Sequence, residues 1–192
     1  MKKKMNNQTL FIFILLFGGS IIGIIGTKFI NTEYLNQLDG ILLPLNETYD
    51  LYSTFIFQFT LQFTYILIIL VLGTSILGTI LISLILFTKG FQIGLTCMMF
   101  IYTYELKGIL GIILTLIPQV ILDISPIIII ALFSIESSNH IMYSCMNGLK
   151  LKISNELNKG LNYSLTSIFV ALITSFLKVT LIIMLIRFFN QF

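Results

Sequence analysis

The chain has 192 residues, of which 57% are apolar and only 10% are charged, and its mean hydropathy is +1.01. A soluble domain carries about 25% charged residues, and a chain of this size cannot hide so much apolar surface from water. The composition therefore excludes a soluble enzyme, a nucleic-acid-binding protein and a disordered regulator. It predicts an all-α polytopic bundle of membrane helices that forms one domain over residues 1–192.

The first predicted span covers Met5–Thr27, which contains no charged residue and is long enough to cross a hydrocarbon core of about 30 Å. Lys2, Lys3 and Lys4 precede it as in a secretion signal, but no cleavage motif of the A-x-A type follows. We therefore expect a retained helix, followed by an outer loop over residues 31–50.

The uncharged run Leu51–Thr88 is too long for a single span, because it would form about 57 Å of helix at about 1.5 Å per residue. We predict a tilted or interfacial lead-in over Leu51–Phe63, where Gln58 and Gln62 interrupt the apolar pattern. A full span over Thr64–Phe87 follows.

The next two predicted spans are less regular. Phe91–Tyr104 is short for a crossing, and Gly108–Phe133 contains Pro118 and Pro126. Proline removes a backbone donor and disfavours helix in the preceding residue, so the freed carbonyls need protein or water partners in lipid. We expect either a short helix followed by a Pro-kinked helix, or a pair of half-helices, with the irregular element at 108–135.

Residues 136–160 are polar and amphipathic, and Met142, Met146 and Leu149 share one face. We predict a helix on the cytoplasmic leaflet that favours anionic lipid; a docking helix for a cytoplasmic partner is the alternative. The last predicted span is Leu161–Ile186.

Five spans with a cytoplasmic N-terminus and an outer C-terminus explain the charges best, because basic residues collect on the cytoplasmic side of membrane proteins. The inner side then holds Lys2, Lys3, Lys4, Lys89, Lys150, Lys152 and Lys159. The outer side holds the bases Lys28, Lys107 and Arg187 and the acids Glu33, Asp39, Glu47, Asp50 and Glu105.

The sequence contains no nucleophile–base–acid set, metal-ligand pattern, phosphate loop or cofactor motif. We therefore expect no enzymatic activity, no metal and no cofactor. The single histidine, His140, follows Ser137-Ser138-Asn139, a pattern typical of a helix N-cap on the surface. Cys97 and Cys145 are too few for a disulfide framework.

Glycines spaced four residues apart indicate close packing of helix backbones in lipid. Gly19 and Gly23 have this spacing in the first span, and Gly90 and Gly94 repeat it. Packing within the chain is the simpler interpretation, and a homodimer face is the alternative.

Polar residues form two stripes at helical spacing within the apolar spans. One comprises Gly111, Thr115, Gln119 and Asp123, and the other comprises Ser164, Ser167, Ala171, Thr174 and Lys178. A charge at the bilayer centre costs about 2.5–3.5 kcal/mol on insertion scales, so intramembrane ions usually have partners. Asp123 and Lys178 are candidates for a structural ion pair, although Lys178 is close enough to the outer end to snorkel instead.

A further pattern runs through the middle of the chain: Lys89-Gly90 and Gly94 follow a hydrophobic span, and then come Gly108, Gly111, Pro118-Gln119 and Asp123. This pattern resembles the stage II sporulation protein M family of bacterial membrane proteins. The sequence departs from the family where a proline is expected at Ser125 and comes instead at Pro126.

The resemblance implies a non-enzymatic protein of the bacterial cell membrane. The family's namesake acts in engulfment with two peptidoglycan-degrading partners, the stage II sporulation proteins D and P. We therefore expect a scaffold or anchor for envelope remodelling, bound to lipid and to other envelope proteins and open to homo-oligomerisation. Its candidate partner surface is the acidic outer loop with Glu33, Asp39, Glu47 and Asp50.

Other relatives occur in bacteriocin export or immunity clusters, which gives the alternative of a permease subunit for a peptide or small solute. Gln119, Asp123 and Lys178 would then line its cavity, and an ATPase would dock near residues 136–160.

Overall fold

The computed structural model describes residues 2–29, 51–148 and 153–190, and all of them lie in helices or in short turns between helices. The elements are α1 (Lys2–Gly26), the 3-10 turn η1 (Thr27–Phe29), α3 (Leu51–Gly73), α4 (Gly78–Gly111), the π-helical segment η2 (Ile112–Leu116), α5 (Ile117–Met146) and α6 (Ile153–Asn190).

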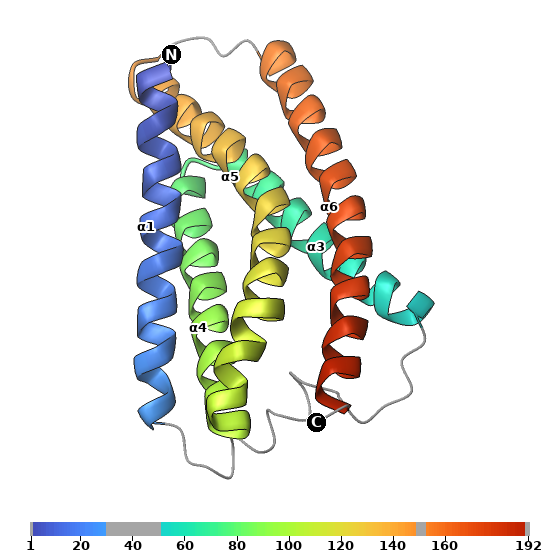
Figure 1. Ribbon diagram of the computed structural model, residues 1–192. Coiled ribbons are helices and arrows are strands. Elements are labelled where there is room, and N and C mark those ends of the chain that lie inside the picture. Colours follow the sequence, from blue (N-terminus) through green and yellow to red (C-terminus); the bar gives the residue numbers. More distant parts are fainter. Residues whose placement is uncertain (1, 30–50, 149–152, 191–192) are drawn as a thin grey trace.

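Five described helices are long and apolar enough to cross a membrane, which confirms the all-α polytopic bundle. The candidate spans are Asn7–Gly26, Tyr52–Gly73, Gly78–Tyr102, Ile117–Met146 and Asn158–Leu181. The start of α1 and the end of α6 lie at opposite ends of the bundle (Figure 1), as an odd number of crossings requires.

The boundary between the second and third spans differs from the prediction. Helix α3 is continuous, and α4 begins at Gly78, so the predicted lead-in at 51–63 and span at 64–87 are wrong. The turn between them is closed by backbone hydrogen bonds, including one from Ser75 N to Leu72 O at 2.9 Å. Glycine is required beside this turn, because a Cβ at Gly78 would lie 2.0 Å from the Leu72 carbonyl oxygen.

This turn moves Lys89 from the predicted cytoplasmic boundary into the middle of a span. The third span is Gly78–Tyr102, and at about 1.5 Å per residue Lys89 lies about 16 Å along the helix from Gly78 and about 20 Å from Tyr102. The predicted position of Lys89 at the cytoplasmic end of a span is therefore wrong. The span begins at the turn before Gly78, and Lys89 does not mark its end.

The chain reverses between the third and fourth spans inside a stretch that is helical throughout. Phe100 and Leu116 are both buried and pack in one cluster, although a straight helix would separate them by about 24 Å. A Cβ at Gly108 would lie 2.2 Å from the Phe100 carbonyl oxygen, which places the reversal between these two residues. The third and fourth spans are two full crossings, and neither the predicted short third helix nor a pair of half-helices is present.

The prolines are accommodated without breaking α5. Pro118 lies in its first turn, directly after the π-helical segment, and Pro126 lies inside the helix. Pro126 lacks the N–H that would bond the Leu122 carbonyl, and Ser125 Oγ donates to that carbonyl at 3.2 Å instead. From α6, Ser167 Oγ donates to the carbonyl of Pro126 at 2.7 Å. The Ser125 hydroxyl thus supplies a donor to the carbonyl that the proline leaves without one, as lipid requires, and Ser167 adds a contact between α5 and α6.

The segment 136–160 is not one amphipathic helix as predicted. Helix α5 continues to Met146, and α6 begins only at Ile153. Gly148 has φ 63°, a left-handed conformation that glycine adopts without steric cost at the end of a helix. The predicted amphipathic face is therefore divided between two helices.

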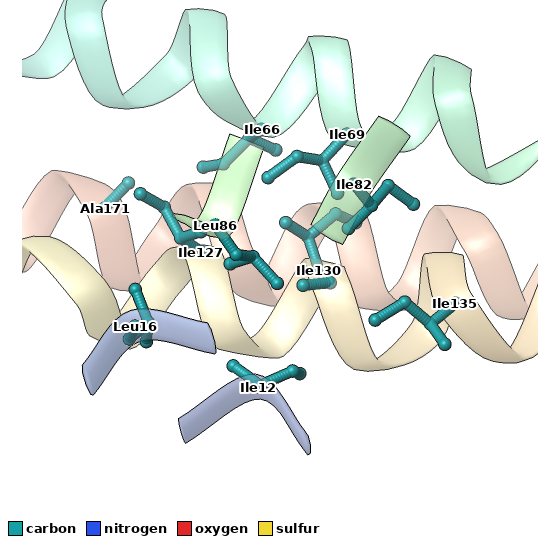
Figure 2. Close-up of a cluster of buried hydrophobic side chains, with 11 residues drawn as sticks. Ile12, Leu16, Ile66, Ile69, Ile82, Leu86, Ile127, Ile130, Ile135 and Ala171 are labelled. Carbon is teal, nitrogen blue, oxygen red and sulfur yellow. The ribbon is translucent and has the colours of Figure 1, made fainter. Parts of the chain in front are cut away.

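The core collects aliphatic side chains from all five spanning helices (Figure 2). Ile12 and Leu16 come from α1, Ile66 and Ile69 from α3, Ile82 and Leu86 from α4, Ile127, Ile130, Ala131 and Ile135 from α5, and Ala171 from α6. Many large apolar side chains, such as Ile80 and Phe169, are exposed on the outside, as expected of surfaces that face lipid.

Helices α1 and α4 pack backbone to backbone through the predicted glycines. A Cβ at Gly19 would lie 2.3 Å from the Phe87 carbonyl oxygen, and one at Gly90 would lie 2.2 Å from the Leu16 carbonyl oxygen. Gly23 and Gly94 continue the contact one turn further along, where a Cβ would lie 2.3 Å from the Phe91 carbonyl oxygen and 2.1 Å from the Ser20 carbonyl oxygen, respectively. These four glycines therefore pack within the chain.

Substitution at Gly19 tests this contact, with its neighbour as a matched control. Gly19→Ala should lower the free energy of unfolding by about 1–3 kcal/mol, because overpacking forces the two helices apart. A Cβ at Gly18 would meet nothing within 4 Å, so Gly18→Ala should leave the unfolding midpoint in detergent unchanged or slightly higher. Equal losses in the two variants would contradict the contact.

The topology is tested by labelling single cysteines in a chain in which Cys97 and Cys145 are replaced by alanine. Phe29 is 84% exposed and ends the turn η1 after α1, whereas Ile76 is 49% exposed and lies in the turn between α3 and α4. The end of α1 and the start of α4 lie at opposite ends of the bundle (Figure 1). With a cytoplasmic N-terminus, Phe29→Cys should react with a membrane-impermeant thiol reagent in intact cells, and Ile76→Cys should react only after permeabilisation. The reverse pattern would invert the orientation.

Candidate functional site

Side chains from α3, α5 and α6 form a polar cluster inside the bundle. Its members are Gln58 and Gln62 of α3, Asp123 of α5, and Thr174, Ser175 and Lys178 of α6. Residues four apart lie on the same side of a helix, which explains how both glutamines, and both Thr174 and Lys178, reach this point.

The predicted ion pair of Asp123 and Lys178 forms at the centre of this cluster. Lys178 Nζ lies 2.7 Å from Asp123 Oδ2 and also donates to Gln58 Oε1 at 2.8 Å. Lys178 therefore points towards α5 and α3. The other carboxylate oxygen of Asp123 accepts a hydrogen bond from Gln62 Nε2 at 3.0 Å, so both oxygens of the acid have partners.

Gln62 connects the ion pair to the hydroxyls of α6. Its carbonyl oxygen Oε1 accepts hydrogen bonds from Thr174 Oγ1 at 3.1 Å and from Ser175 Oγ at 3.2 Å. Gln62 is 4% exposed and Ser175 is completely buried. One amide thus binds α5 with its nitrogen and α6 with its oxygen.

The exposure of the charged groups decides what the cluster can do. The side chains of Lys178 and Asp123 are 13% and 30% exposed, and each contacts an opposite charge and a glutamine amide. An intramembrane charge is stable when it is paired in this way. The polar cluster therefore holds three helices together through groups that satisfy one another.

The remaining residues of the two predicted stripes have different surroundings. Ser164, Ser167 and Ala171 of α6 are buried on the inner face, as the spacing indicates. Gln119 lies one turn before Asp123, but its Nε2 is buried without a hydrogen-bond partner, so it does not join the polar cluster. The side chain of Thr115 lies outside the described residues.

Gln58, Gln62 and Ser175 are the members of the cluster that the sequence reasoning missed. The two glutamines interrupt an apolar run, and their spacing of four residues within that run marks a polar face. The predicted partner surface, with Glu33, Asp39, Glu47 and Asp50, lies outside the described residues.

A second polar contact joins α5 to the start of α4. Ser138 Oγ accepts a hydrogen bond from the Thr79 backbone N–H at 3.0 Å and donates to the Ser75 carbonyl at 2.8 Å. Thr79 Oγ1 donates to Asn139 Oδ1 at 3.0 Å. Helix α4 has no side-chain cap of its own, so the serine–asparagine pattern predicted to cap its own helix lies inside α5 and caps α4 instead.

Lys89 is another cation inside a described span, and it has a weaker partner than Lys178 has. Its Nζ lies 3.9 Å from the centroid of the Tyr65 ring. Such a contact contributes about 0.5–1 kcal/mol at exposed sites and about 2 kcal/mol when desolvated, which is less than the insertion cost of about 2.5–3.5 kcal/mol. Among the described residues no carboxylate pairs with it, because Asp123 is bonded to Lys178.

Groups suited to metal binding are not brought together among the described residues: no three histidine, cysteine, aspartate or glutamate side chains come close enough to hold an ion. His140 and Cys145 are exposed near the end of α5.

The comparisons with known proteins identify one family. The sequence model described as Stage II sporulation protein M matches residues 9–188, which contain four of the five spans completely and all but the first two residues of the span Asn7–Gly26. No curated protein and no solved structure matched the chain.

Removal of either partner tests the ion pair. Asp123→Asn or Lys178→Met alone leaves an unpaired charge; this costs about 3–5 kcal/mol at a fully buried site, and with side chains 30% and 13% exposed we expect about 1–3 kcal/mol. The double variant should recover part of the loss, with a coupling free energy of at least about 0.5 kcal/mol in detergent unfolding.

Thr180 provides the control. It lies on the exposed side of α6 and bonds only to its own helix, so Thr180→Val combined with Asp123→Asn should give additive losses. Additive losses for Asp123→Asn and Lys178→Met as well would mean that the two charges do not interact.

Proposed function

The chain belongs to the stage II sporulation protein M family, and we propose that it acts as a non-enzymatic scaffold that positions other proteins during remodelling of the bacterial cell envelope. Its five spans make it a multi-pass membrane protein. In this proposal its contribution is the surface that it presents on either side of the membrane.

The observation that supports the proposal is that the polar side chains of the cluster form hydrogen bonds and an ion pair with one another. A permease needs polar side chains that are available to a passing solute, whereas Asp123, Lys178 and Gln62 are bonded to one another across three helices. A catalyst needs a nucleophile or base beside an open position. The cluster has the character of a clamp, which supports a structural role.

The distribution of charge supports a cytoplasmic N-terminus. With Lys89 inside the third span, the order of the spans in the sequence assigns Lys2, Lys3, Lys4, Lys150, Lys152 and Lys159 to the proposed cytoplasmic side. The same order assigns Lys28, Lys107 and Arg187, together with most of the acids, to the proposed outer side. The bias still agrees with the positive-inside rule.

The outer segment 31–50 is the proposed recruitment surface. It carries four acids and no basic residue, so it suits a basic extracytoplasmic partner by charge complementarity. Peptidoglycan hydrolases are the partners that the family suggests for this surface.

A comparison of two variants at equal membrane abundance tests the proposal. Neutralising Glu33, Asp39, Glu47 and Asp50 as their amides should lower recruitment of envelope partners and leave insertion intact, because none of them lies in a span. Asp123→Asn should lower recruitment only as far as it lowers folded protein. Partner recruitment is measured by cross-linking in native membranes.

The control keeps the loop's charge while changing its shape: Glu33→Asp, Asp39→Glu, Glu47→Asp and Asp50→Glu together should retain recruitment. Normal function of the neutralised loop variant, together with a well-folded but inactive Asp123→Asn protein, would contradict the scaffold proposal and favour a permease.

A further inference from the structure

The face of α4 around Lys89 has polar groups at a depth where lipid offers them no partner. Lys89 is half-buried and Gln92, one turn further along, is exposed. Lys89 lies near the middle of the span Gly78–Tyr102, and a lysine side chain is much shorter than its distance from either end. Its ammonium group therefore stays within the hydrocarbon.

The chain itself satisfies these two head groups only in part. The Lys89 ammonium lies over the Tyr65 ring at 3.9 Å, a contact that offsets less than the cost of placing a charge in lipid. The Gln92 amide has no side-chain hydrogen bond within the described residues. By contrast, Thr88 on the same exposed face donates to the Ile85 carbonyl at 2.9 Å.

We propose that Lys89 and Gln92 form a docking site for a membrane-spanning helix of another protein, one that carries an aspartate or glutamate near its middle. Residues three apart on a helix are neighbours, so the ammonium and the amide can both donate to one carboxyl group. Such polar groups hold helices together in lipid. This inference deepens the proposed function, on which it rests, by naming the chemistry of a partner.

Among the described residues, a second copy of the chain offers no free acid at this depth. Asp123 is engaged in the polar cluster. Glu136 lies two residues before Ser138, which contacts Thr79 at the start of α4. In a copy with the same orientation Glu136 is therefore about 12 Å along the helix axis from the depth of Lys89.

The test measures binding of a synthetic helix to the full-length protein in vesicles of phosphatidylcholine and phosphatidylglycerol. The probe is a membrane-spanning leucine–alanine peptide with one central glutamate, and the matched peptide has glutamine there. Energy transfer is measured from a donor on Cys145, which is exposed, in a Cys97→Ala background. The glutamate peptide should bind about three- to tenfold more tightly than the glutamine peptide.

Variants of α4 assign this preference to its residues. Lys89→Met should reduce the ratio of the two affinities to about one, Lys89→Arg should keep it, and Gln92→Leu should lower it by a smaller factor. Thr88→Val is the control on the same exposed face; it should change nothing, because its hydroxyl is already bonded within α4.

Four results would overturn the proposal. These are equal binding of both peptides, a preference that survives Lys89→Met, an equal loss in Thr88→Val, and association of the protein with itself or with phosphatidylglycerol that depends on Lys89. The vesicles contain no envelope protein, so a negative result would contradict the docking site on α4 without contradicting the scaffold proposal. A negative result with the loop variant would likewise contradict recruitment by the outer loop without contradicting the docking site.

Discussion

Gln62 holds the arrangement of α3, α5 and α6 together, because its single amide bonds to both of the other helices. The nitrogen donates to Asp123 and the oxygen accepts from Thr174 and Ser175. Lipid offers no competing hydrogen bonds, so helices in a membrane separate only at the cost of leaving such groups unsatisfied. The ion pair with Lys178 depends on the same contact, since Gln62 holds one carboxylate oxygen while Lys178 binds the other.

Two kinds of contact therefore hold the helices of the bundle together. Helices α1 and α4 meet through glycines that leave room for backbone contact, with no polar side chain between them at Gly19 or Gly90. Helices α3, α5 and α6 meet through paired polar side chains. Ser138 couples the two groups, because it is part of α5 and caps the first turn of α4. Packing and hydrogen bonding, rather than a hydrophobic driving force, are what hold helices together in lipid.

Composition and spacing predicted the helical class, the number of spans, the glycine contact and the pairing of Asp123 with Lys178. They failed where the answer depends on contacts between distant segments. Hydropathy cannot divide the uncharged run 51–88, because glycines that make a turn look the same as glycines that pack inside a span. The serine–asparagine pattern around Ser138 does indicate a cap, but a sequence does not say which helix is capped. The partners of Gln62 are likewise far from it in the chain.

The placement of polar groups favours a role in holding proteins over a role in moving solutes. A permease concentrates unsatisfied polar groups on its interior and presents an apolar exterior to lipid. In the described part of this chain the ion pair and its glutamines are satisfied inside, whereas the half-buried Lys89 and the exposed Gln92 have incomplete partners. Because an incompletely paired charge at this depth is costly, it persists most readily in a protein whose surface is covered by a neighbour. Both features fit the proposed role as a scaffold for other membrane proteins.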